Sequence, residues 1–188
     1  MTVTSENARE WIAKHGKTAS QKPNAWKGTF AIPESLVRYY DEIGPVNINI
    51  ESYGNSFHLP RLSQLWKFQA GYRWNGVTNE PIADWNDDWL VVGDQGGDPL
   101  IFSRATGEIL FAEHGAGRWE PKPLFPDLTA MAACLGMLGE IVVAAGDGFT
   151  DDRDRIVREH RNRAIETLQE ALGSKSKAQN VLKILGWA

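Results

Sequence analysis

The sequence predicts an α+β fold: a mostly antiparallel sheet with helices packed on it, followed by further helices at the C-terminal end. Two observations predict this class. Three short apolar and β-branched segments follow one another between residues 85 and 115, and Gly-bearing turns separate them, as in successive antiparallel strands. Segments with apolar residues at helical spacing lie before and after this run. The expected order is therefore helix, helix, strand, helix, strands, helices.

Four elements are expected in the first 72 residues. Pro33 suits the first turn of a helix, where its missing N–H has no partner, and Gly44 with Pro45 ends that helix. The strand alternates apolar and polar residues, which predicts one face exposed to solvent. The expected elements are a helix over residues 5–15 with Ser5 as N-cap, a helix that begins at Ile32 and Pro33, a strand over residues 46–53 and a helix over residues 61–72.

The central stretch is expected to form three sequential antiparallel strands. Its turns are expected over residues 93–98 (GDQGGD) and 104–108 (RATGE), because Gly supplies the positive φ that hairpin turns demand. The strands are expected at residues 89–92, 100–103 and 109–112.

The C-terminal part predicts an irregular connection and then three helices. The connection, residues 119–126, holds three prolines, and Asp127 follows it as a candidate helix cap. The first of these three helices is strongly apolar, the second is amphipathic, and the third is short. The helices are expected over residues 128–145, 153–172 and 177–185.

The apolar helix over residues 128–145 is long enough to span a membrane at the lower limit. Glu140 lies inside it, and no cluster of Lys or Arg flanks it. We therefore expect a buried helix of a globular domain. Gly136 and Gly139 would let another element approach it closely.

Composition limits the class of protein. The chain has 188 residues, 42% of them hydrophobic, with eight Trp and a net charge of −4. This length fits one domain, with or without an appendage, and the negative charge would repel nucleic acid and anionic membranes. The single cysteine, Cys134, lies in an apolar run, so a buried, reduced thiol is expected. The N-terminus has no secretory signal pattern, so we expect a cytoplasmic protein.

Several motifs occur in a fixed order: Ile32–Pro33 opening a helix, LPRLSQLW at residues 59–66, a strand led by Trp89, Gly96–Gly97–Asp98, Thr106–Gly107–Glu108, and a helix from Asp127. Together, over about residues 29–140, they resemble the SUKH superfamily, which includes the fungal cell-wall assembly regulator Knr and many bacterial immunity proteins. The resemblance implies a compact binding domain without cofactor or catalytic residues, often one that neutralises a toxin delivered by a neighbouring cell. Gly44–Pro45 departs from the family's usual Asn-Gly. The organisation that we expect is an N-terminal helix and arm (1–28), a SUKH-like α+β domain (29–145) and a C-terminal helical extension packed on the domain (146–188).

The candidate binding face lies in the most negative stretch of the chain. No Lys or Arg occurs from residue 74 to residue 103, whereas six acids do. Clustered carboxylates steer and orient a basic partner, and Trp is enriched at interface hot spots. The same stretch is also compatible with a solvated sheet face, and a Trp in a strand is usually core. The predicted partner-binding residues are Trp85, Asp87, Asp88, Trp89, Asp94 and Asp98.

Other chemistries fit the residues less well. The turn over residues 93–98 could cradle a phosphate or a metal, but neither a helix nor a Lys-Ser/Thr pair follows it, so a plain hairpin turn is favoured. His58 and His114 lack a compact ligand spacing with Asp94 or Asp98, so neither metal nor cofactor is expected. The arginines between residues 153 and 163 could contact RNA, but the neighbouring acids favour a salt-bridged, solvated face.

The resulting expectation is a non-enzymatic protein-binding module: a bacterial immunity protein that neutralises a toxin by docking an acidic, Trp-containing face on a basic toxin domain. Two alternatives stay open. One is a small hydrolase using Asp94, Asp98 and His114, and the other is a regulatory scaffold protein.

Overall fold

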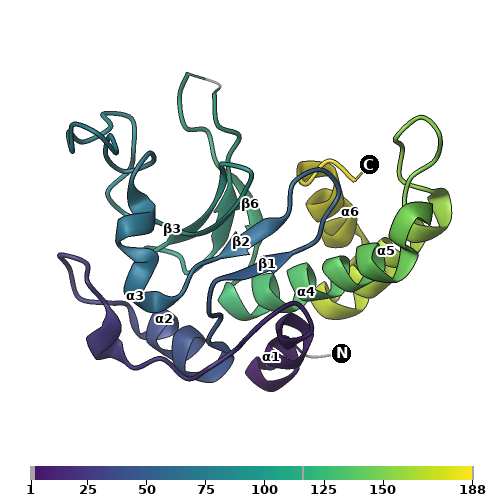
Figure 1. Cartoon of the computed structure of the whole chain (residues 1–188), viewed down its shortest axis with the longest axis horizontal. Coiled ribbons are helices and arrows are strands. Elements are labelled where there is room, and N and C mark those ends of the chain that lie inside the picture. Colours follow the sequence, from purple (N-terminus) through teal and green to yellow (C-terminus); the bar gives the residue numbers. More distant parts are fainter. Residues whose placement is uncertain (1–2, 116, 188) are drawn as a thin grey trace.

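The computed structural model describes residues 3–115 and 117–187 (Figure 1). Its sheet has six antiparallel strands arranged in chain order: β1 (Ile48–Ile50), β2 (Phe57–Leu59), β3 (Trp89–Gln95), β4 (Asp98–Ser103), β5 (Ile109–Phe111) and β6 (Lys122–Phe125). The α-helices are α1 (Ser5–Ala13), α2 (Glu34–Arg38), α3 (Leu62–Leu65), α4 (Leu128–Ala145), α5 (Arg158–Leu172) and α6 (Lys175–Ile184). The predicted α+β class, with an antiparallel sheet and C-terminal helices, is confirmed.

The three central strands form the predicted meander. β3 pairs with β4, and β4 pairs with β5, both antiparallel. The first turn is tighter than expected, because the strand continues to Gln95 and only Gly96 and Gly97 connect it to β4. Both of these glycines have positive φ, 62° and 101°, as a two-residue hairpin turn requires. A bulge between Val91 and Gly93 shifts the register within this hairpin.

Two short strands, β2 and β6, were not predicted from the sequence. β2 has three residues, and β6 lies within the stretch 119–126 that was expected to be irregular. β6 is an edge strand that pairs only with β5, so Pro123 can sit opposite Leu110 without removing a hydrogen bond from a second neighbour. The prolines also blunt this edge against pairing with another chain.

Several helix boundaries differ from the expectation. Thr4, and not Ser5, is the N-cap of α1, because its Oγ1 accepts a hydrogen bond from the N–H of Asn7 at 3.3 Å. The helix expected over residues 61–72 ends as α3 at Leu65 and continues as a short 3₁₀ turn. The helix expected from residue 153 begins at Arg158, because the preceding residues form a loop in which the Asp151 carboxylate binds the Arg155 guanidinium at 2.7 Å.

Helix α4 lies at the centre of the main core, where it contacts strands of the sheet and packs against α1 and α5 (Figure 1). Its predicted cap is present, since the Asp127 carboxylate accepts from the N–H of Ala130 at 2.7 Å. The stretch Leu128–Gly148 is long and apolar enough to span a membrane, but 67% of its apolar 18-residue part is buried inside the protein, as in a core helix. The same core includes side chains of α1, α5 and α6.

The close approach predicted at the two glycines is made by helix α1, which crosses α4 there. A Cβ atom built on Gly136 would lie 2.8 Å from Cβ of Trp11 and 3.1 Å from the backbone N of Ile12. At Gly139 it would overlap Ile50 and His15. The ring Nε2 of His15 lies 2.9 Å from the carbonyl oxygen of Gly136, to which it donates a hydrogen bond. The absence of side chains at these positions thus sets the α1–α4 distance.

Candidate functional site

The second face of the sheet carries its own small core. Successive strand residues point to opposite faces, so Leu90 and Val92 join the main core whereas Val91 faces the other way. Val91, Ile101 and Ala112 are covered on that face by Tyr72 and Trp85. The covering residues come from residues 66–89, which connect α3 to β3. This connection carries the candidate site.

The connection forms a groove that we name the tryptophan groove. Its volume is about 570 Å³, within the range typical of ligand sites. The walls are mainly aromatic and apolar, with one ion pair. The groove is lined by Trp66, Arg73, Trp74, Asn79, Pro81, Ile82, Ala83, Trp85 and Asp87.

One rim of the groove is a tight loop over residues 75–80. The side-chain oxygen of Asn75 accepts from the N–H groups of Val77 and Thr78 at 2.8 and 3.1 Å. The Asn75 N–H donates to the carbonyl of Glu80 at 2.8 Å, which closes the loop. This local hydrogen bonding holds Val77 at the tip, where it is 90% exposed. The loop is therefore preformed and presents an apolar side chain beside the groove.

Arg73 is the central polar residue of the groove, and only 15% of its side chain is exposed. Its guanidinium donates to the Asp87 carboxylate at 2.7 Å and to the carbonyl oxygens of Asp87 and Trp89, each at 3.1 Å. The same group lies 5.9 Å from the ring centroids of Phe30 and Trp66, close enough for cation–π attraction. Arg73 thus joins the Trp66 wall to the start of β3.

A second arginine supports the same backbone. The Arg104 guanidinium donates to the carbonyl oxygens of Asp87 and Asp88 and lies 4.2 Å from the ring centroid of Phe30. Arg73 and Arg104 stand immediately outside the stretch without Lys or Arg, at its two ends. Arg73 and Arg104 thus bind the acidic stretch from its two ends. The Asp87 side chain nevertheless stays 94% exposed.

Of the predicted residues, Trp85 and Asp87 lie in the groove. Trp85 is only 7% exposed, and its ring packs edge-on against Trp89 and Trp119 at centroid distances of 5.4 and 5.5 Å. Its indole N–H points to the carbonyl of Trp89 at 3.4 Å. Trp89 is half-buried beneath it. Trp85 therefore forms part of the groove floor and does not project as an anchor.

Asp88 stabilises the turn between β4 and β5. Its carboxylate accepts from the Ser103 hydroxyl at 2.9 Å and from the N–H of Ala105 at 3.1 Å. Asp98 has a similar role further along, since it accepts from the backbone N–H of His114 at 2.7 Å and contacts the His114 ring at 2.6 Å. Both carboxylates satisfy local donors in the structure.

Asp94 accepts from the hydroxyl of Tyr72 at 3.0 Å. Burial, and then the nearby charges of Asp94 and Asp98, raise the pKa of Tyr72 above its ordinary value. Asp94 is five residues from Trp89 along β3, which corresponds to roughly 17 Å at about 3.3 Å per residue. The six predicted residues therefore fall into two groups: Trp85, Asp87, Asp88 and Trp89 at one end of β3, and Asp94 and Asp98 at the other.

The alternative hydrolase hypothesis uses Asp94 and Asp98 of this second group together with His114. His114 contacts Asp98, and Asp94 is bonded to Tyr72. None of the five pockets described is lined by Asp94, Asp98 or His114. His58 bonds to the Asn49 carboxamide at 2.8 Å. Over residues 3–115 and 117–187, no three His, Cys, Asp or Glu side chains are grouped to hold a metal ion.

The surroundings of Cys134 do not activate its thiol as a nucleophile. It is fully buried in α4, and burial, with a smaller contribution from the charge of Asp127, raises the pKa of its thiol. The thiolate is the reactive form of cysteine, so this environment disfavours covalent chemistry at Cys134.

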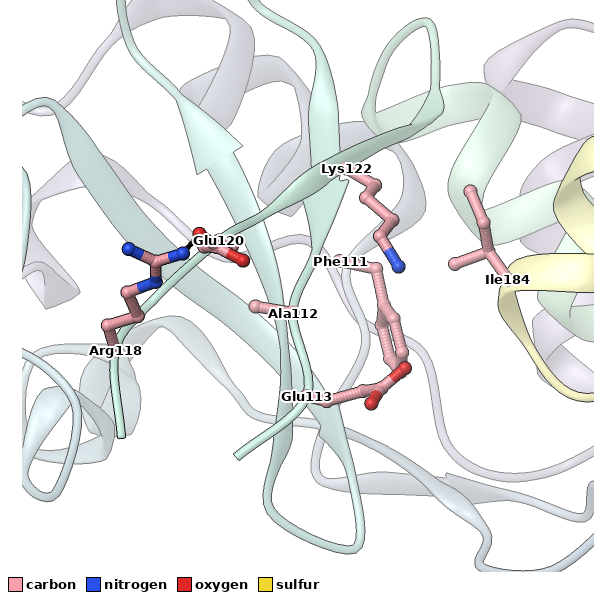
Figure 2. Close-up of a pocket in the computed structure, with 7 residues that line it drawn as sticks. All are labelled: Phe111, Ala112, Glu113, Arg118, Glu120, Lys122 and Ile184. Atoms are coloured by element: carbon pink, nitrogen blue, oxygen red, sulfur yellow. Dashed lines mark ion pairs between the residues drawn. The ribbon is translucent and has the colours of Figure 1, made fainter. Parts of the chain in front are cut away.

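A smaller pocket lies between β5, β6 and α6 (Figure 2). It is lined by charges of both signs, and Figure 2 shows the ion pair between Arg118 and Glu120 at one side and Lys122 reaching toward Phe111. Its volume of about 90 Å³ is that of roughly three water molecules. It is too small for an organic ligand.

The groove residues Trp66, Arg73 and Trp74 were not among the predicted site residues. The sequence does carry a signal for them, because residues 66–74 contain four aromatic side chains in nine positions. In the structure, Trp66 and Trp74 contact each other at a centroid distance of 5.0 Å.

In comparisons with known proteins, no protein-family model, no curated protein and no solved structure matches the chain. The resemblance to the SUKH superfamily therefore stays a prediction.

Proposed function

We propose that this chain is a non-enzymatic protein-binding module that takes up its partner in the tryptophan groove. One observation carries the proposal: a preformed groove of about 570 Å³, walled by Trp66, Trp74 and Trp85, opens beside the exposed carboxylate of Asp87. Binding energy at protein interfaces is concentrated in aromatic and Arg residues that line desolvated pockets. A side chain of the partner would insert between these rings.

The rim of the groove supports a protein partner. Val77 at the loop tip is 90% exposed, and it lies two residues before Asn79, which lines the groove. Asn75 holds this loop by four hydrogen bonds. A preformed surface loses little conformational entropy on binding.

Charge favours a basic partner. Glu80, Asp84 and Asp87 are exposed around the groove, within the stretch that contains no Lys or Arg. Like the resemblance to immunity proteins, this arrangement supports the proposal that the chain neutralises a basic toxin domain. The direct test is co-expression with the product of a neighbouring toxin gene. Restored growth of the host is expected, and growth arrest despite soluble expression of this chain would contradict the immunity role.

The groove is tested by Val77→Lys. The substitution places a positive charge on the apolar loop tip, which would repel a basic partner, and we expect partner affinity to fall by about tenfold or more, the equivalent of ~1.4 kcal/mol. Isothermal titration calorimetry with the partner isolated from the native host measures this affinity. The matched control is Val143→Lys, which charges the other large apolar side chain that is exposed among the described residues, on α4 and outside the groove. Equal losses in both variants would place the interface elsewhere.

The acidic rim is tested through the association rate. Asp87→Asn should slow association a few-fold and weaken its dependence on salt, because rim charges act mainly on encounter and are screened at higher ionic strength. Asp94→Asn is the control, since Asp94 lies at the far end of β3 and is bonded to Tyr72. Stopped-flow kinetics at low and moderate salt distinguish the two. An association rate that changes neither with salt nor in the Asp87→Asn variant would contradict electrostatic docking.

The hydrolase alternative rests on the contact between His114 and Asp98. It predicts that His114→Ala removes an activity without changing partner binding. A regulatory scaffold would use the same tryptophan groove for a resident partner, and host growth in the co-expression assay separates it from an immunity protein.

A further inference from the structure

A second pocket lies between α5 and α6, away from the tryptophan groove. We name it the α5–α6 pocket. Its volume is about 410 Å³, which is enough for a small organic molecule. α5 and α6 lie beside each other near the C-terminal end (Figure 1). The pocket is lined by Arg161, Asn162, Ile165, Gln179, Leu182, Lys183 and Trp187.

The charges of the α5–α6 pocket are all positive. Arg161 comes from α5 and Lys183 from α6, and no Asp or Glu is among the lining residues. Within the part of the chain that the structure describes, neither side chain has a hydrogen bond or an ion pair. Two cations that line one pocket without counter-charges repel each other, and a bound anion would relieve that repulsion.

Trp187 adds an unsatisfied donor. The residue is 1% exposed, and its indole N–H is buried without a hydrogen-bond partner among the described residues. The indole nitrogen only donates, and nearly all buried polar groups in proteins are paired. The ring is held edge-on against Phe149 at a centroid distance of 5.2 Å, and the backbone N–H of Trp187 donates to the carbonyl of Leu182 at 2.7 Å. The indole nitrogen itself has almost no accessible surface, so Trp187 lines the α5–α6 pocket without offering this donor to a ligand.

The remaining lining determines the rest of the ligand. Ile165 and Leu182 give the pocket an apolar wall, and the carboxamides of Asn162 and Gln179 supply further polar groups. Guanidinium and ammonium groups together recognise an oxygen-bearing anion. An apolar wall next to them suits a hydrocarbon or aromatic body.

We propose that the α5–α6 pocket binds a small organic oxyanion, a carboxylate or a phosphate carried on an apolar or aromatic body. Arg161 and Lys183 bind the anionic group, and Ile165, Leu182 and Trp187 contact the apolar body. This site does not depend on the tryptophan groove, so either proposal can fail without the other.

The test is a titration of the ¹⁵N-labelled full chain followed by NMR. The probes are phenyl phosphate, benzoate, inorganic phosphate and the uncharged phenol. Phenyl phosphate or benzoate should bind saturably and shift the indole N–H resonance of Trp187, which lines the pocket, whereas phenol should not bind. The tighter of the two organic anions identifies the preferred anionic group. Weaker binding of inorganic phosphate is expected, because it lacks the apolar body.

Variants decide whether the named residues are responsible. Arg161→Gln and Lys183→Gln should each weaken binding of the better probe by at least about tenfold, since each removes a charge-assisted hydrogen bond. Arg163→Gln removes the same charge from an exposed position of α5 outside the lining and should leave binding unchanged. Trp187→Phe identifies the indole resonance. If that variant does not fold, the two charge variants and their control still decide. Absence of saturable binding, or an equal loss in Arg163→Gln, would overturn the proposal.

Discussion

Truncation of the chain after Gly148 should abolish cooperative folding. Besides Phe149, the deleted segment contributes five large buried side chains to the main core, which represent roughly 8–15 kcal/mol of gross burial at about 1.5–3 kcal/mol each. A whole domain is stable by only about 5–15 kcal/mol. The truncated chain would also expose the α4 face that α5 covers. Loss of a thermal transition by calorimetry, or insoluble expression, is the expected observation. The five side chains are Leu168, Val181, Leu182, Leu185 and Trp187.

A single substitution provides the graded version of this experiment. Leu168 is completely buried, and Leu168→Ala should lower the free energy of unfolding by about 2–5 kcal/mol, the usual cost of such a cavity. Glu166→Ala, on the exposed side of α5, is the control and should change stability little. A truncated chain that melts like the full chain would show that α5 and α6 are an independent appendage.

Gly136→Ala should destabilise the protein by about 1–3 kcal/mol, the cost of overpacking a close contact. The sign of this effect is informative, because helix propensity alone favours alanine over glycine by ~1 kcal/mol. The new Cβ would lie 2.8 Å from Cβ of Trp11 and 2.9 Å from its backbone carbonyl carbon, so α1 itself must move. For a chain of this length a loss of 1 kcal/mol corresponds to roughly 2–4 °C in melting temperature, which calorimetry measures.

The control for this substitution is Gly148→Ala. A Cβ at Gly148 meets no atom within 4 Å, so no steric cost is expected there. If Gly136→Ala instead raises the melting temperature, the α1–α4 crossing is looser than the structure indicates.

The tryptophan groove depends on contacts that join distant parts of the chain. Phe30 lies far before the groove in sequence, yet it contacts Trp66 at a centroid distance of 5.6 Å and lies under Arg104. Arg104 in turn binds the backbone of Asp87. A substitution of Phe30 or Arg104 would therefore alter the groove wall without changing a residue that lines the groove.

The elements that the sequence alone determined are those with local causes. The meander from β3 to β5 follows from apolar strand residues and from glycines that adopt positive φ in the turns. Helix α4 begins and ends where its composition indicated, because the Asp127 carboxylate caps its own first turn. The close approach of another element to Gly136 and Gly139 was also predicted from the sequence. The sequence did not identify α1 as that element.

Only the tertiary structure decided the rest, because the causes lie outside each segment. Strands β2 and β6 are too short to be recognised without the neighbours that pair with them. A sequence shows the acids of the stretch without Lys or Arg but not their partners, so it could not reveal that Asp88 and Asp98 satisfy nearby donors while Asp87 stays exposed. Exposure is a property of the packed chain: Trp85 is buried under Trp119, from more than thirty positions away, and the donors of the α5–α6 pocket meet only when the two helices pack together.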